Sequence, residues 1–143
     1  MTETYSHLLV GLDLSDEAAQ VLRRAQLLAQ NLQAKISVAH VIEPLTFAYG
    51  GDVPLDIVET QKIIEDQAHT RLTALISESG VNVSQRWVTL GQTASEIHRL
   101  AEENHVDLVV VGSHGRHGLA LLFGSTANGV LHGAKCDVLA VRV

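Results

Sequence analysis

The chain of 143 residues is long enough for one domain of ordinary size, and its 46% of hydrophobic residues can fill a core. A formal net charge of −6, scattered Lys and Arg residues and only 3% aromatic residues argue against a broad nucleic-acid-binding surface. No apolar run approaches the roughly 18 residues of a membrane span. The start lacks a signal-peptide pattern, and the single cysteine, Cys136, cannot form an internal disulfide, so we expect a cytoplasmic protein.

The first third of the chain predicts two strands joined by a helix. The apolar run 7–12 predicts a strand, and Ser15 is a possible N-cap for a helix that continues to about Leu32. The β-branched stretch 35–42 predicts a second strand. Residues 43–55 contain both prolines and predict a long loop of the kind that is often functional.

The middle of the chain predicts a long helix, an edge strand and a capped helix. Residues 56–79 have one apolar stripe, and Gly80 is expected to end that helix. The segment 81–90 alternates only partly and contains polar residues, which suits a strand at the edge of a sheet. Thr93 and Glu96 match a capping box, so Thr93 is predicted as the N-cap of the next helix.

The last third predicts two further strands and a short helix. The stretch 106–111 is almost entirely apolar, as expected for a strand that is covered on both faces. A helix near 125–132 and a final strand over 138–143 follow. Strands that alternate with helices predict a single α/β domain over 1–143, with a parallel sheet between two helical layers.

Ligands of such sheets bind beyond the carboxyl ends of the strands, where the winding reverses. Asp13 follows the first predicted strand, and Gly112 follows the fourth. If these two strands are neighbours, the two turns face each other across one crevice. Gly112 and Gly115, followed by Gly124 and Ser125, then form either a phosphate cradle of backbone amides or a purely structural glycine turn. The sequence contains no P-loop and no dinucleotide fingerprint.

Polar residues near these turns can either contact a ligand or have a purely structural or solvent-exposed role. The Asp13 carboxylate can accept hydrogen bonds from a ligand's base or ribose, or it can brace its own turn. His114 is the histidine best placed to contact a ligand, and Arg116 either reaches a phosphate or points to solvent. His114 and His117 lack the Cys or carboxylate neighbours that zinc requires, so no metal site is predicted. No general base or nucleophile can be assigned around Cys136, so no catalytic residue is predicted.

Several segments together resemble the universal stress protein family across essentially the whole chain. These segments are Leu8–Asp13 with Ser15, His40–Glu43, Asp107–Gly115, Gly124 with Ser125, and Val138–Val141. The resemblance implies a three-layer, Rossmann-like adenine-nucleotide-binding fold with strand order 3-2-1-4-5. It also implies a homodimer in which strand 138–143 pairs with the same strand of a second copy. Free N–H and C=O groups on an edge strand suit that pairing.

The chain keeps these glycines and so resembles the ATP-binding branch of the family. The resemblance implies ATP as the ligand, with Mg or Mn bound through the phosphates. By this resemblance, Asp13 and Val41 contact the nucleoside. The residues implied around the ribose and phosphates are Gly112, His114, Gly115, Gly124, Ser125 and Thr126. The implied function is a dimeric sensor or switch in the stress response, with slow ATP hydrolysis at most.

Departures from the family pattern include a shortened spacer, which favours an alternative. Eight residues separate Gly115 from Gly124, where the ATP-binding branch has nine. Asp137 stands where relatives often carry proline. The alternative is a nucleotide-free dimeric interaction protein whose glycines reflect fold geometry alone. A small hydrolase or transferase of the same broad fold is a third reading, but no catalytic constellation supports it.

Overall fold

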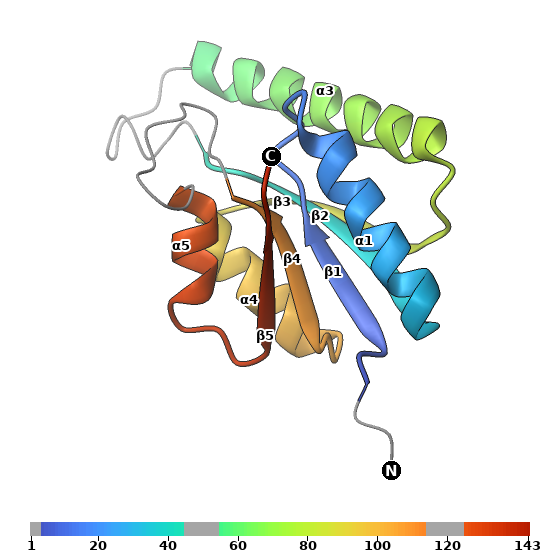
Figure 1. Cartoon of the computed structure of the whole chain (residues 1–143). Helices are drawn as coiled ribbons and strands as arrows, with labels where there is room; N and C mark the ends of the chain where they lie inside the picture. Colours follow the sequence, from blue (N-terminus) through green and yellow to red (C-terminus); the bar gives the residue numbers. More distant parts are fainter. Residues whose placement is uncertain (1–3, 45–54, 114–124) are drawn as a thin grey trace.

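The structure is a computed structural model that describes residues 4–44, 55–113 and 125–143. Its parallel sheet lies between helices on both faces (Figure 1). The strands are β1 (His7–Gly11), β2 (Lys35–Ile42), β3 (Val83–Leu90), β4 (Leu108–Gly112) and β5 (Asp137–Val141), and the helices are α1 (Ala18–Leu32), α3 (Leu55–Ser79), α4 (Thr93–Glu103) and α5 (Ser125–Leu131). The predicted α/β class is confirmed. Most of the predicted loop 43–55 lies outside the described residues.

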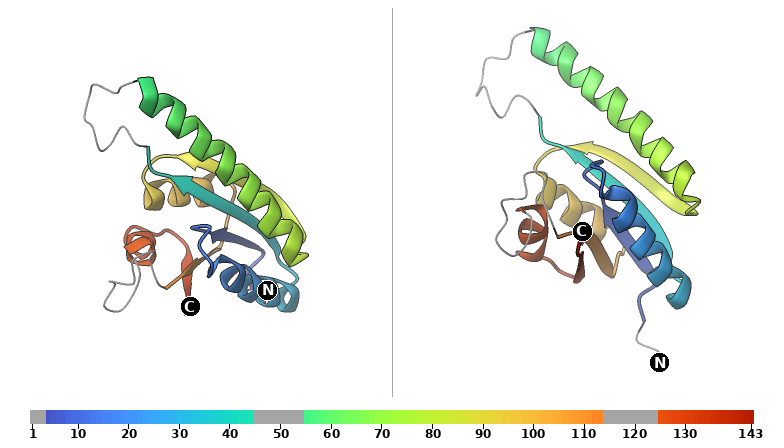
Figure 2. Two further views of the ribbon diagram at one scale, coloured as in Figure 1. Left: turned by 90° about the horizontal axis from the view of Figure 1, so that it is seen from above. Right: turned by 45° about the horizontal axis from the view of Figure 1, so that its top comes forward.

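Two hydrophobic clusters explain why the central strands are apolar on both faces. One cluster joins the sheet to α1 and α3, and the other joins the opposite face to α4 and α5 (Figure 2). On β1, Leu8 belongs to the first cluster and Leu9 to the second, and both are fully buried. Successive side chains of a strand point to opposite faces, so a doubly covered strand must be apolar throughout.

The sheet has the order β3-β2-β1-β4-β5, as the resemblance implied. The chain first winds from β1 toward β3 and then returns to the other side of β1 with β4. β1 and β4 are therefore neighbours in the sheet, which confirms the condition for the predicted crevice. β3 lies at one edge of the sheet, as its polar residues predicted, and β5 forms the opposite edge.

The ends of the helices differ from the prediction in two places. α1 begins at Ala18 with Glu17 as its N-cap, so the prediction of Ser15 as the cap is wrong. The Thr93 capping box is also wrong, because Gln92 is the N-cap of α4 and its side chain accepts a hydrogen bond from the Ser95 amide at 3.0 Å. The side chain of Glu17, unlike that of Gln92, makes no capping hydrogen bond. Gly80 ends α3 as predicted, with φ at +71°.

Asp137 has a structural partner at the β5 edge. The Tyr5 hydroxyl donates a hydrogen bond of 2.6 Å to the Asp137 Oδ2, and this bond raises the pKa of Tyr5. The segment before β1 is thereby tied to β5, two strands away in the sheet. No helix within residues 4–44, 55–113 and 125–143 is long and apolar enough to cross a membrane.

Candidate functional site

The carboxyl edge of three adjacent strands gathers those predicted site residues that the structure describes in full. Asp13 lies two residues beyond β1, Val41 is near the end of β2, and Gly112 ends β4. Because β1 lies between β2 and β4, these three residues come from one continuous stretch of the sheet edge. Asp13 and Val41 are half-buried, and Val41 packs with the cluster on the α4 face.

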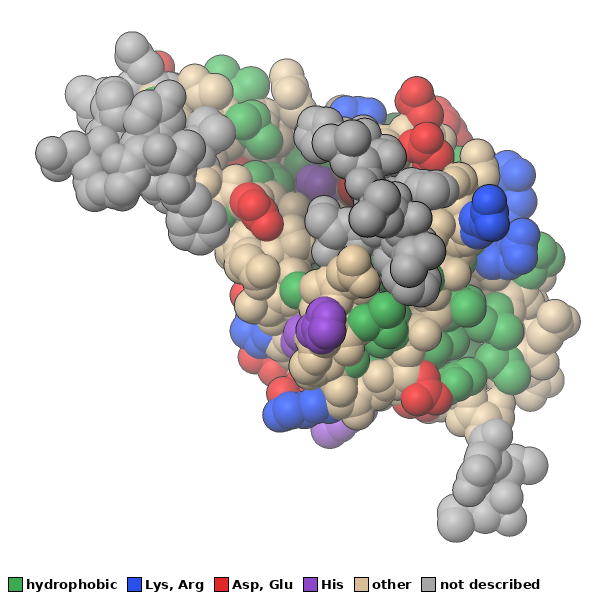
Figure 3. Space-filling model, turned by 60° about the vertical axis from the view of Figure 1, so that its left-hand side comes forward, with side chains coloured by type: hydrophobic (Ala, Val, Ile, Leu, Met, Phe, Trp, Pro, Cys, Tyr) green, Lys and Arg blue, Asp and Glu red, His purple; other side chains and the backbone are tan. Residues whose placement is uncertain are grey.

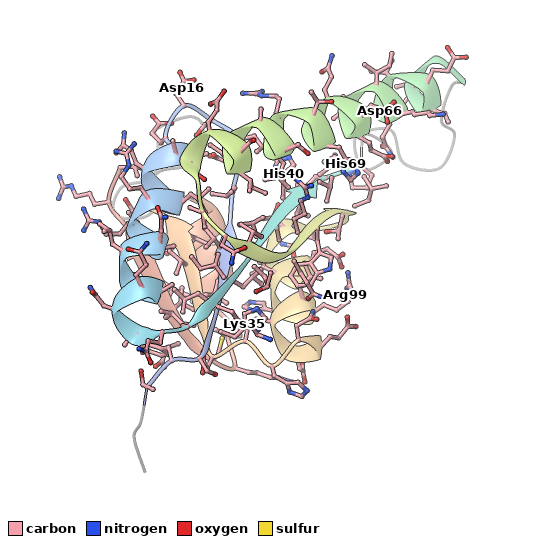
Figure 4. All side chains as sticks on the ribbon, turned by 90° about the vertical axis from the view of Figure 1, so that its right-hand side faces the viewer. Asp16, Lys35, His40, Asp66, His69 and Arg99 are labelled. Atoms are coloured by element: carbon pink, nitrogen blue, oxygen red, sulfur yellow. The ribbon has the colours of Figure 1, made fainter. Side chains whose placement is uncertain are left out.

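The turn after β1 is held by hydrogen bonds on several sides. Oδ1 of Asp13 accepts from the Ser15 amide at 3.0 Å and from the Ser15 hydroxyl at 2.6 Å. The Leu12 carbonyl accepts from Nδ1 of His40 at 2.7 Å, and the Leu12 amide donates to the Ala39 carbonyl at 2.9 Å. Figure 4 shows His40 on β2 beneath α3. Within the part of the chain that the structure describes, Oδ2 of Asp13 has no hydrogen-bond partner.

Leu14, the next residue, has an unusual backbone conformation. Its φ is +61°, although its side chain is a buried member of the core at 7% exposure. A positive φ is uncommon for a residue other than glycine and carries a free-energy cost. The Leu14 carbonyl accepts a hydrogen bond of 2.7 Å from Nη2 of Arg71, which lies on α3. A helix that is distant in the sequence therefore contacts the backbone next to Asp13.

Gly112 has a packing reason of its own. A Cβ at this position would lie 3.3 Å from Cγ2 of Val21 on α1 and 3.6 Å from Cγ2 of Val143. Tight contact with α1 is therefore enough to favour glycine here, without a ligand. The structural reading of this glycine remains as well supported as the phosphate-cradle reading.

Ser113, directly after Gly112, carries a polar atom without a partner. The side chain is buried at 8% exposure, and its Oγ has no hydrogen-bond partner among residues 4–44, 55–113 and 125–143. Its amide donates to the Val141 carbonyl at 2.7 Å, so its backbone is held against the end of β5. Buried hydroxyl groups in native proteins are nearly always hydrogen-bonded. An unpartnered hydroxyl at the carboxyl edge of the sheet is therefore the feature that most favours a polar ligand here.

The rest of the predicted site is only partly described. His114, Gly115 and Gly124 lie outside the described residues, and Ser125 and Thr126 begin α5. Among residues 4–44, 55–113 and 125–143, no group of three or more His, Cys, Asp or Glu side chains is arranged to hold a metal ion.

Comparison with known proteins identifies the family. The model of the Universal stress protein family matches residues 4–142. Universal stress protein A homolog 1 of Coxiella burnetii is 41% identical over 138 residues, which cover 96% of each chain. The chain belongs to the universal stress protein family.

Solved structures of other members have the same fold. UspA from Lactobacillus plantarum is 25% identical, with a TM-score of 0.75 over 99% of this chain and all of that one. A universal stress protein in complex with cAMP is 27% identical, with a TM-score of 0.62 over 97% of this chain and 98% of that one.

Sequence reasoning missed three residues that shape this site. Ser113 lies inside the glycine motif, and its position after an apolar strand was the signal that could have singled it out. His40 was noted only as part of the family segment His40–Glu43, whereas its ring donates to the Leu12 carbonyl in the turn after β1. Arg71 gave no signal, because its partner Leu14 is 57 positions away in the chain.

Proposed function

We propose that this universal stress protein binds ATP at the carboxyl edge of β1, β2 and β4 and acts in the cytoplasm as a dimeric sensor or switch. The observation that carries the proposal is the buried hydroxyl of Ser113, which has no partner among the residues that the structure describes and follows β4, the neighbour of β1. Such a hydroxyl costs free energy unless a bound group supplies a partner. A nucleotide, rich in hydroxyl, phosphate and ring nitrogen groups, fits this requirement.

The residues present fit an adenine nucleotide in their chemistry. The Asp13 carboxylate has a second oxygen available to accept hydrogen bonds from the nucleoside, and Val41 offers an apolar surface beside it. By the family resemblance, Gly112, His114, Gly115, Gly124, Ser125 and Thr126 surround the ribose and phosphates. Mg or Mn is proposed to bind through the phosphates, since the described residues include no group of three His, Cys, Asp or Glu side chains that could hold a metal ion. No general base is assigned, so slow hydrolysis is the most activity we propose.

The relative solved with cAMP supports an adenine nucleotide as the ligand class. The same family membership supports a homodimer through strand 138–143. β5 is an edge strand whose central residues, Val138, Leu139 and Ala140, are only half-buried. Figure 3 shows hydrophobic side chains gathered on the face of the molecule that includes this edge. Pairing with a second copy covers these side chains and the open backbone groups.

The test is equilibrium dialysis of the purified protein against labelled ATP, together with native mass spectrometry to detect a copurifying nucleotide. We expect saturable binding that is lost in Gly115→Val, because a branched side chain would block the backbone's approach to the phosphates. Absence of saturable binding by the wild-type protein at millimolar ATP would refute the proposed function.

Replacing Ser113 with Ala should separate ligand binding from stability. We expect ATP affinity to fall about threefold to tenfold, the value of one neutral hydrogen bond. The ligand-free protein should unfold at the same or a higher temperature, because an unpartnered buried hydroxyl has been removed. Dialysis and thermal unfolding measure the two effects, and Ser84→Ala on exposed β3 serves as the control. Unchanged ATP affinity in the Ser113 variant would remove this residue from the site.

The alternative is a nucleotide-free dimeric interaction protein, and the eight-residue spacer between Gly115 and Gly124 favours it. Both functions use the β5 edge, so sedimentation velocity alone does not separate them. Dialysis does, because the alternative expects a dimer that binds no nucleotide at all.

A further inference from the structure

We propose that Arg71 is a positioning residue that holds the Asp13 turn in its ligand-ready conformation and so links α3 to the nucleotide site. The inference rests on the proposed function only for the identity of the ligand. The decisive contact is the 2.7 Å hydrogen bond from Nη2 of Arg71 to the Leu14 carbonyl.

The turn needs an external brace because its backbone conformation is unfavourable. Leu14 has φ at +61°, and only the surrounding structure can keep a leucine in this region. Leu14 lies between Asp13 and Ser15, which are joined by two hydrogen bonds to one carboxylate oxygen. Relaxation of Leu14 to a negative φ would rotate the adjoining peptides and move the Asp13 carboxylate.

Arg71 is well placed to prevent that relaxation. A guanidinium donates a charge-assisted hydrogen bond, which is stronger than one between neutral groups. Its helix is fixed close by, since Ala68 and Leu72 of α3 are buried in the same cluster as Leu12 and Leu14. The bond therefore runs from a side chain on a packed helix to the backbone of the turn.

The other polar groups of the turn have different partners. His40 donates to the Leu12 carbonyl, and Ser15 donates to the Asp13 carboxylate. Among the described residues, Arg71 is the side chain that donates to the Leu14 carbonyl. Loss of Arg71 consequently removes the hydrogen bond at the strained residue itself and leaves the flanking bonds to bear the strain.

The experiment compares Arg71→Met with Arg24→Met. Methionine retains most of the aliphatic stem but removes the donor and the charge, and Arg24 is an exposed arginine on α1 with the same change of charge. The first measurement needs no ligand. In Arg71→Met, the amide of Ser15 should exchange its hydrogen at least about fivefold faster, because its acceptor is no longer held in place. The Arg24 variant should match the wild type.

The second measurement is a double-mutant cycle on ATP affinity. Arg71→Met should weaken binding about tenfold, and Arg71→Lys, which keeps a donor, should lie between that variant and the wild type. In an Asp13→Ala background the same Arg71 change should weaken ATP binding by less than about twofold, because there is no carboxylate left to position. A purely structural role of Arg71 would instead give the same loss in both backgrounds.

The outcomes separate the two proposals. Unchanged Ser15 exchange in Arg71→Met, or equal ATP losses with and without Asp13, overturns the positioning role. Faster Ser15 exchange in a protein that does not bind ATP even as wild type supports Arg71 as the brace of the turn and refutes the nucleotide function.

Discussion

Replacing Asp13 with Asn will weaken ATP binding by about tenfold to a hundredfold, as expected when a hydrogen bond to a charged acceptor is lost. The substitution removes the charge but retains Oδ1, which in the structure accepts both hydrogen bonds from Ser15. The turn should therefore persist while its ligand contact weakens. Isothermal titration calorimetry with ATP measures the change in affinity.

The control for this substitution is Asp16→Asn. Asp16 lies three positions further along the chain, is exposed and points away from the body of the protein (Figure 4). Because it carries the same charge, its variant reports any long-range electrostatic effect on a negatively charged nucleotide. If both variants bind ATP like the wild type, Asp13 has only a bracing role, which is the second of the two readings that the sequence left open.

Replacing His7 with Ala will lower the free energy of unfolding by about 2–5 kcal/mol, through lost packing and two orphaned polar groups. His7 is 3% exposed and lies at the start of β1. Its Nε2 is 2.7 Å from the Ser37 hydroxyl, and its Nδ1 is 3.1 Å from the Asn104 carbonyl. A carbonyl only accepts, so Nδ1 carries the proton and the Ser37 hydroxyl donates to Nε2. The neutral ring satisfies both partners.

The same histidine makes stability depend on pH. Burial, the largest effect, lowers the pKa of His7 below 6.5; Lys35 adds to this, while the Asn104 carbonyl and Asp107 oppose it. Below pH 6.5 the unfolded chain therefore binds a proton that the folded protein does not bind, until the pH falls below the lowered pKa of the native state. The stability that neutral His7 contributes is complete above pH 6.5 and declines as the pH falls through this window.

Denaturant unfolding between pH 7.5 and 5 measures both effects of His7. The wild type should lose stability toward pH 5, and His7→Ala should be less stable at pH 7.5 with a shallower dependence on pH. His69→Ala is the control, because His69 is exposed on α3. An equally steep pH profile in His7→Ala would mean that another group causes the acid sensitivity.

A carboxylate beside His7 extends this effect to stronger acid. Burial alone would raise the pKa of Asp107, but hydrogen bonds from the amides of Ser6 and His7 and from the Ser6 hydroxyl outweigh it and lower the pKa. Its contribution to stability is therefore present above pH 3.8 and is lost as the pH falls further.

The arrangement of the sheet was largely predictable from the sequence. Continuous apolar runs mark β1 and β4 because both of their faces are covered, and the polar residues of β3 mark an edge. Neighbouring positions for Asp13 and Gly112 followed once the order of the strands was implied by the family. These predictions succeeded because they depend on periodic patterns that many residues share.

Individual hydrogen-bond partners were much less predictable. The Thr93 capping box matched its pattern, yet the side chain of the preceding Gln92 reaches the Ser95 amide, and Glu96 pairs with Arg99 at 2.8 Å. The Ser15 hydroxyl bonds to Asp13 and does not cap α1. Each outcome depends on a choice between nearby partners of similar strength, which the residue types alone do not decide.

β1 connects two regions with separate roles. Its first residue, His7, lies beside Asp107, and these two residues make stability depend on pH. Asp13 lies two residues beyond the other end of β1. At roughly 3.3 Å per residue these regions are on the order of 20 Å apart, a separation at which substitutions combine additively. Substitutions around Asp13 can therefore change the proposed ligand site without lowering the stability that His7 contributes at the other end of β1.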